Sequence, residues 1–315
     1  MTRWRRVLCI AVLAAPQWTP QWAPQWVWAQ DRPRLMTAAE LKALPSGTPD
    51  HVEPYGSAES QFGELRVPPG PGPHPVVVLV HGGCFRKPFA GVKSIGSMGE
   101  ALKKEGIASW SIEYRRLPED GSGWPGTYRD VAAGVDHLRT LAKAHRLDLS
   151  RVVLLGHSAG AHLAHWAAAR SRLKPDSALY MPDPLRPAGV LNLAGKMDMT
   201  VDIVAYEATC GIPVLRLLVG GLPEQVPEHY AQVSLPQLLP LGVRQVMVWG
   251  EHEDYVPRRQ VEDYVAAARR AGDEADLIVL PALGHFEIAS PASTAWPTVL
   301  GAVKKLLASP VPARP

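Results

Sequence analysis

Residues 156–160 read Gly-His-Ser-Ala-Gly, and their flanks constrain the fold more than any other feature of the chain. The preceding run 151–155 is apolar and β-branched, which favours a buried strand, and the alanine-rich run 161–170 favours a helix. A strand, a G-x-S-x-G turn and a helix in this order raise a serine hydroxyl above the end of the strand. The glycines leave room where side chains would clash. We therefore expect Ser158 to be a nucleophile.

Apolar strand patterns and amphipathic helix patterns alternate along the rest of the chain. We expect strands at 63–67, 76–80, 107–114, 151–155, 189–193, 243–249 and 277–280, and helices at 37–44, 97–105, 128–145, 161–170, 258–271 and 298–307. This alternation predicts an α/β fold with a doubly wound, mostly parallel sheet. Residues 30–60 are polar and proline-rich, so we expect them to lie over the surface. Residues 195–241 break the alternation and predict a small cap insertion, with a surface excursion as the alternative.

The first 29 residues have the pattern of a secretory signal peptide. Three arginines precede an apolar run at 7–15, and a Pro-Gln-Trp motif then repeats with a period of four up to a cleavage position after Ala29. The apolar run is too short to span a bilayer, although a short membrane anchor is the alternative. We expect residues 1–29 to be removed, residues 30–315 to form one α/β domain, and the protein to be periplasmic or secreted.

Charge and cysteine content narrow the function classes further. The chain has 33 basic and 30 acidic residues, and the expected signal peptide carries three of the basic ones, so the remainder is balanced. A nucleic-acid partner is not expected, because it requires a basic stripe. Outside the signal peptide the cysteines are Cys84 and Cys210, which would meet an oxidising compartment. Two cysteines leave open whether a disulfide forms.

A serine nucleophile needs a base and an acid. His285 follows the last expected strand, and a histidine there can take the serine proton. The order serine, acid, histidine along the chain is the one expected after a G-x-S-x-G turn. Glu253 stands three residues after Gly250 and four before Pro257, the spacing common for the acid in such folds. Asp254 is the alternative acid, and since neighbours in an extended loop point in opposite directions, only one of the two can reach His285.

The sequence also offers an oxyanion hole. Residues 81–85 read His-Gly-Gly-Cys-Phe and come directly after the strand expected at 76–80. Glycines at this place let backbone N–H groups face a developing oxyanion. We assign the donors to Gly83 or Cys84 and to Ala159, the residue after the nucleophile. Cys84 would then act through its backbone, and a catalytic cysteine is the alternative.

These motifs resemble the α/β-hydrolase superfamily, and more closely its esterase/lipase and kynurenine-formamidase-like group, which carries H-G-G-x-W. Phe85 stands here where that group has tryptophan. Residues 113–116, 123–126 and 130–132 are similar to the segment that such enzymes carry before the nucleophile. The resemblance extends over most of the chain and implies the fold and a serine hydrolase. It does not fix the substrate, because this fold hosts many reactions.

We therefore expect hydrolysis of a carboxylic ester through an acyl-enzyme, with Ser158, Glu253 and His285 as the catalytic residues. An amidase, formamidase or peptidase with the same triad is the alternative, and a non-catalytic binding protein on the same fold is the alternative from another class. No cofactor and no metal is expected. The expected partner is a small-molecule ester or amide, without stable membrane insertion. Acyl length, natural substrate and oligomeric state stay undetermined.

Overall fold

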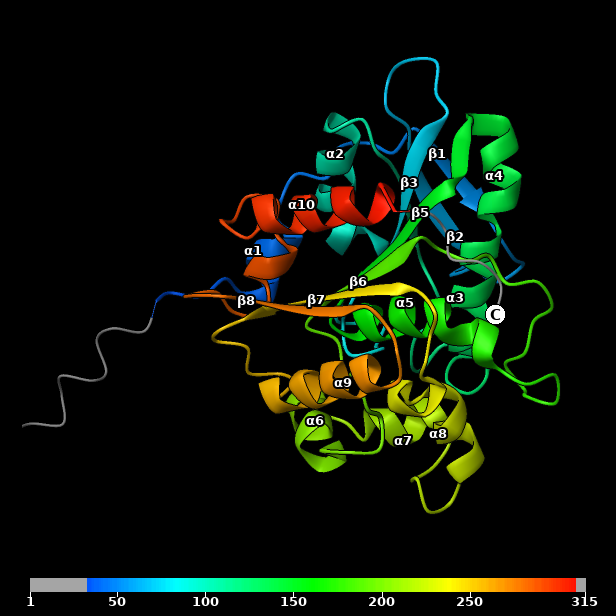
Figure 1. Ribbon diagram of the computed structural model, residues 1–315, viewed down its shortest axis with the longest axis vertical. Helices are drawn as coiled ribbons and strands as arrows, with labels where there is room; N and C mark the ends of the chain where they lie inside the picture. The colour runs from blue at the N-terminus through cyan, green and yellow to red at the C-terminus, as the bar shows by residue number, and fades with distance from the viewer. Residues whose placement is uncertain (1–32, 310–315) are drawn as a thin grey trace, which may run out of the picture. The chain divides into compact units, whose positions relative to one another are not determined.

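Eight strands form one mixed sheet in the order β1-β2-β4-β3-β5-β6-β7-β8 in the computed structural model, which describes residues 33–309 (Figure 1). Their bounds are β1 (His51–Pro54), β2 (Phe62–Arg66), β3 (His74–Val80), β4 (Ala108–Ile112), β5 (Leu147–His157), β6 (Gly189–Leu193), β7 (Arg244–Gly250) and β8 (Ala275–Leu280). The pairs β1–β2 and β2–β4 are antiparallel, and every other neighbouring pair is parallel. The sheet is therefore mostly parallel, as expected.

Helices cover both faces of this sheet. They are α1 (Ala38–Lys42), α2 (Gly96–Lys104), α3 (Gly126–Asp136), α4 (Leu138–His145), α5 (Ala159–Ala169), α6 (Ile203–Cys210), α7 (Val214–Val219), α8 (Pro227–Val233), α9 (Arg258–Arg270) and α10 (Trp296–Leu307), with short 3-10 turns η2 (Val92–Ile95), η3 (Arg170–Arg172), η4 (Leu235–Leu238) and η5 (Glu287–Ala289). Figure 1 shows α2 and α10 over one face and α3, α5 and α9 over the other. The doubly wound arrangement is confirmed.

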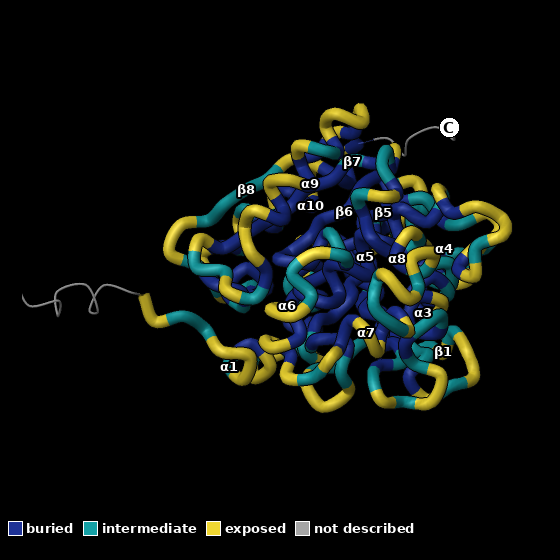
Figure 2. Tube along the Cα trace, turned by 90° about the horizontal axis from the view of Figure 1, so that it is seen from below, coloured by how far each residue is buried: buried dark blue, intermediate teal, exposed yellow. Residues whose placement is uncertain are grey.

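Helix α5 lies against β5 and β6 in the buried, dark blue interior of Figure 2. Every residue of α5 is buried, and six of its positions are alanine, which allows the helix axis to approach the sheet closely. In β3, Val76–Val80 are wholly buried because β4 and β5 flank the strand in parallel and helices cover it. The buried helix α5 and the buried strand β3 flank the end of β5 and so fix the position from which Ser158 projects.

Two local expectations were wrong. The helix expected at 128–145 is divided into α3 and α4 at His137. The carbonyl of Gly134 accepts a hydrogen bond from the Trp110 indole at 2.9 Å, and in an unbroken helix that carbonyl would accept from Leu138. In addition, residues 51–54, for which no strand was expected, lie at the surface as the edge strand β1. Polar side chains and Pro54 are tolerated there because only one side of an edge strand is paired.

The segment 195–241 contains α6, α7, α8 and η4. A disulfide between Cys84 and Cys210 joins the last residue of α6 to the loop after β3. The sequence left this bridge open, and the structure contains it. Between residues 33 and 309, no helix has the length and apolar character needed to cross a membrane.

Candidate active site

Ser158 occupies a strained turn between β5 and α5. Its backbone angles, φ 55° and ψ −125°, lie in a region that residues other than glycine rarely adopt. A Cβ on Gly156 would lie 2.2 Å from the Gly160 carbonyl oxygen, and one on Gly160 would lie 2.2 Å from that of Val80. The Ser158 amide donates to the Leu193 carbonyl at 2.8 Å, which ties the turn to β6. The glycines are therefore required by close backbone approach.

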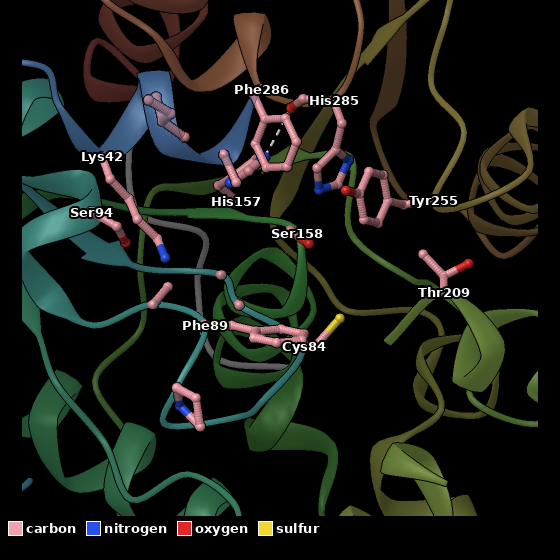
Figure 3. Close-up of a pocket in the computed structure, with 16 residues that line it drawn as sticks. Lys42, Cys84, Phe89, Ser94, His157, Ser158, Thr209, Tyr255, His285 and Phe286 are labelled. Atoms are coloured by element: carbon pink, nitrogen blue, oxygen red, sulfur yellow. Dashed lines mark hydrogen bonds between the residues drawn. The ribbon is translucent and has the colours of Figure 1, made fainter. Parts of the chain in front are cut away.

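The Ser158 side chain lines a cavity of about 340 Å³ together with His285 (Figure 3). It does not cap α5, and within residues 33–309 its hydroxyl has no hydrogen-bond partner, His285 included. The other lining residues are Ala38, Leu41, Lys42, Gly82, Gly83, Cys84, Pro88, Phe89, Ala90, Ser94, His157, Thr209, Tyr255 and Phe286. The structure thus brings the expected nucleophile and base to one cavity, with the hydroxyl uncommitted.

His285 comes from the loop after β8, which is bound to the loop after β7. The Glu251 amide donates to the Leu280 carbonyl, and the His252 amide to the Leu283 carbonyl, each at 2.9 Å. These two bonds extend the pairing of the strands beyond their ends. The carboxylate two residues after Glu251 is thereby carried to the imidazole.

That carboxylate is Glu253. Its Oε2 lies 2.7 Å from His285 Nδ1, and both side chains are buried. Its Oε1 accepts from the amides of Tyr255 at 2.8 Å and Val256 at 3.1 Å. Asp254 is exposed and makes no hydrogen bond or ion pair within residues 33–309. Because Nδ1 donates to the carboxylate, the neutral imidazole presents Nε2 as an acceptor.

Two further residues hold His285, and sequence reasoning assigned neither to the site. Tyr255 stacks on the imidazole with ring centroids 4.1 Å apart. His157 donates from Nε2 to the His285 carbonyl at 2.9 Å (Figure 3). Burial, reinforced by the neighbouring His285, lowers the pKa of His157 to about 3, so it is neutral near pH 7. The available signal was their position in the sequence, since His157 directly precedes Ser158 and Tyr255 stands two residues after Glu253.

The proposed oxyanion donors lie in the loop after β3 and at the start of α5. Gly83 has a φ of 105° and Cys84 a φ of 52°. Within residues 33–309, the backbone N–H groups of Gly83, Cys84 and Ala159 have no protein acceptor. The loop passes close to the nucleophile, since a Cβ on Gly82 would lie 2.9 Å from Ser158 Cβ. These free donors are suited to an anion that forms at the serine.

A buried cluster supports this loop from below. His81 directs Nε2 to Glu113 Oε1 at 2.7 Å and donates from Nδ1 to the Gly82 carbonyl at 2.8 Å. Tyr114 stacks on His81 and donates its hydroxyl to the His81 carbonyl. Burial alone would raise the pKa of Glu113, but the His81 charge and hydrogen bond, together with Arg116, outweigh it and lower the pKa to about 2. Glu113 is therefore a permanent anion under the loop.

In the loop after β3, the side chains of Cys84, Phe85 and Arg86 make structural contacts outside the oxyanion site. Cys84 is bonded to Cys210, and Arg86 donates to the Cys210 carbonyl at 2.8 Å, so the loop is fixed to α6 twice. Phe85 is wholly buried, packs edge-on against His162 and does not line the cavity. The residue that departs from the H-G-G-x-W pattern is thus a core residue here.

The described residues that could together hold a metal ion lie away from this cavity. His51, Glu53 and His145 present ligand atoms within 4.8 Å of one another, on β1 and at the end of α4. None of the three lines the Ser158 cavity.

Comparison with known proteins assigns the family. The model of the BD-FAE family matches residues 66–264, more than half of the chain. The chain belongs to the BD-FAE family. The matched range of this BD-FAE protein contains Ser158 and Glu253, and His285 follows it.

Curated relatives of this BD-FAE protein are named as esterases. A probable isoprenylcysteine alpha-carbonyl methylesterase of Oryza sativa subsp. japonica is 25% identical over 249 residues, which cover 74% of this chain and 57% of the relative. Esterase EstD of Thermotoga maritima is 27% identical over 230 residues, which cover 64% and 55%. The chain thus spans little more than half the length of these relatives.

Solved structures give the fold. Esterase B of Lactobacillus rhamnosis superposes with a TM-score of 0.71 at 18% identity, covering 86% of this chain and 91% of the other. A truncated carbohydrate esterase from gut microbiota has a TM-score of 0.68 at 20% identity, covering 81% and 95%. The expected α/β-hydrolase fold is confirmed.

Proposed function

We propose that this protein is a serine hydrolase that cleaves carboxylic esters through an acyl-enzyme. The observation that carries the proposal is the shared cavity. An uncommitted hydroxyl on a strained turn faces the same space as an imidazole whose other nitrogen is bonded to a buried carboxylate. The names of the curated relatives, all esterases, support this choice of substrate bond.

The reaction would begin with proton transfer. His285 Nε2 takes the Ser158 proton while Oγ attacks the ester carbonyl carbon. Backbone N–H groups of Gly83 or Cys84 and of Ala159 hold the oxyanion. The ester C–O bond then breaks, and His285 returns the proton to the leaving alcohol. Water deprotonated by His285 attacks the acyl-enzyme, and the free acid leaves as Ser158 regains its proton.

Glu253 acts through His285. Its carboxylate keeps the proton on Nδ1 and stabilises the imidazolium that forms during each proton transfer. Its second oxygen is held by two backbone amides, so the carboxylate has a fixed orientation toward the ring.

The assignment of the nucleophile is tested by covalent labelling. A fluorophosphonate probe should label the wild-type protein stoichiometrically, and labelling should be lost in Ser158→Ala together with hydrolysis of p-nitrophenyl esters. Ser293→Ala, another serine near the His285 loop, is the matched control and should label like the wild type. Equal labelling of Ser158→Ala would refute the proposal.

We further propose that the protein acts in the periplasm or outside the cell. The Cys84–Cys210 disulfide supports this location, because such bonds persist in oxidising compartments. The expected signal peptide, residues 1–29, lies outside the described residues. N-terminal sequencing of the exported protein should begin at Gln30, and retention in the cytoplasm would contradict the proposal.

A further inference from the structure

The cavity at Ser158 is lined by one side chain with a permanent charge. Its lining is otherwise apolar, small or hydroxyl-bearing apart from the two imidazoles, and it includes no aspartate, glutamate or arginine. The exception is Lys42, whose ammonium group points from α1 into the space in front of Ser158 (Figure 3). A single cation in such a lining is suited to selecting a substrate by charge.

The helix that carries Lys42 is fixed to the site. Thr37 caps α1 in a reciprocal capping box with Glu40, and Leu41 is buried in the core. The Met36 amide donates to the Glu287 carboxylate, which also accepts from the Gly284 amide at 3.1 Å. Because Gly284 immediately precedes His285 in the same loop, α1 and the imidazole are held by one carboxylate. Lys42 itself is exposed to solvent and lines the rim of the cavity.

The Lys42 ammonium group forms no ion pair with the described part of the chain. Among residues 33–309, no carboxylate forms an ion pair with its ammonium group. Glu40, on the same helix, accepts from the amide and hydroxyl of Thr37, and Glu287 accepts from two backbone amides. An ammonium group without a partner beside apolar walls gains more from an incoming anion than one already paired.

The position of Lys42 indicates which half of the ester bears the anion. His285 must face the leaving alcohol in order to protonate it. In Figure 3 the His285 ring lies directly above the Ser158 hydroxyl, whereas the Lys42 ammonium lies to the left of the hydroxyl, away from the ring. The group that reaches Lys42 therefore belongs to the acyl half.

We propose that the substrates are esters whose acyl chain ends in a carboxylate, which pairs with the Lys42 ammonium. The inference rests on the proposed ester hydrolysis. It narrows the substrate class to half-esters of dicarboxylic acids.

The test compares matched esters on the full chain. Monomethyl adipate and methyl hexanoate differ by a carboxylate in place of a methyl group, and hexanoyl glycolate carries its carboxylate on the alcohol side. At low salt we expect kcat/KM for monomethyl adipate to exceed that for methyl hexanoate by about tenfold. We expect no such increase in kcat/KM for hexanoyl glycolate over methyl hexanoate. In about 1 M salt, where the Debye length is about 3 Å, the preference should shrink.

Variants assign the preference to Lys42. Lys42→Met should bring the ratio of the two kcat/KM values to about one, Lys42→Glu should invert it, and Lys42→Arg should keep it. Lys305→Met, on the exposed face of α10, is the control and should leave the ratio unchanged. An unchanged ratio in Lys42→Met, or a gain for hexanoyl glycolate, would overturn the proposal while ester hydrolysis stands. Loss of all ester turnover with no fluorophosphonate labelling would overturn both.

Discussion

Two groups of the same composition lie in different regions of the molecule. The cavity group consists of His285, Glu253 and Tyr255, and the support group consists of His81, Glu113 and Tyr114. In each, an imidazole nitrogen lies 2.7 Å from a glutamate oxygen. In each, a tyrosine stacks on the imidazole, with centroids 4.1 Å apart in the cavity group and 4.5 Å apart in the support group.

The groups differ in the second imidazole nitrogen. His81 donates its second nitrogen to the Gly82 carbonyl and is wholly buried. His285 lines the cavity, and within residues 33–309 its Nε2 has no partner. Arg116 adds a cation to Glu113, whereas Glu253 is held by backbone amides. The comparison teaches that a buried His–Glu pair alone does not mark a catalytic site; of these two pairs, only the one in the cavity has the open imidazole nitrogen beside a serine that the proposed mechanism requires.

The largest effect is expected from a substitution in the cavity group that removes the carboxylate bonded to His285. Glu253→Gln should lower kcat by about 10³- to 10⁴-fold, because the imidazole loses its preferred tautomer and the stabilisation of its cation. The measurement is steady-state hydrolysis of a p-nitrophenyl ester, with circular dichroism to verify the fold. Asp254→Asn is the matched control and should stay within about twofold of the wild type. The opposite pattern would show that Asp254 is the acid.

The next largest effect is expected on stability, from a substitution in the support group. The folded-state pKa of Glu113, about 2, lies below its ordinary value of 4.5, so the interaction stabilises the fold fully above pH 4.5 and is lost as the pH falls toward 2. Glu113→Gln should therefore lower the free energy of unfolding by on the order of 3 kcal/mol at pH 7. Urea unfolding of both proteins should show this difference shrinking below about pH 4.5.

Two comparisons keep this prediction specific. Glu262→Gln removes an exposed ion pair with Arg258 and should cost less than about 1 kcal/mol at any pH. Acid also destabilises the wild type through buried histidines, since burial lowers the pKa of His162 to about 3, but this contribution cancels in the difference between the two proteins. A difference that does not change with pH would mean that the Glu113 carboxylate is not the stabilising species.

The smallest effect concerns the stacked tyrosine. Tyr255→Leu should lower kcat roughly three- to tenfold, because an aromatic contact on the His285 ring is worth about 0.5–1.5 kcal/mol. Tyr255→Phe keeps the ring and should retain most of kcat. Equal losses in the two variants would assign the effect to the hydroxyl instead. Pre-steady-state acylation rates separate this effect from changes in deacylation.

Much of the fold could be predicted from the sequence, because its central strands are continuous apolar runs. The strand expected at 189–193 coincides with β6, and the expected and observed bounds of α9 differ by one residue. The edge strand β1 was missed, since its polar residues are stabilised by pairing with β2 rather than by burial. The break at His137 depends on the Trp110 indole, a tertiary contact that no local pattern contains.

The site residues likewise include some that the sequence predicted and some that it did not. Turn chemistry and chain order placed Ser158 and His285 at one cavity, and residue spacing selected Glu253 over Asp254 as the neighbour of His285. Lys42 was not foreseen, because its helix is remote in sequence and is brought to the cavity by tertiary contacts with the His285 loop and with η2. A sequence records such long-range contacts only indirectly.

The Cys84–Cys210 bridge closes a covalent ring that includes the whole stretch from β4 to α6, with Ser158 inside it. Its two α-carbons lie 5.7 Å apart, within the range that a disulfide spans. In the folded protein the bridge therefore ties the loop that carries Gly83 to the end of α6. A count of reactive thiols at Cys84 and Cys210 would report the fraction of molecules in any preparation that lack this tie, without the need for a substrate.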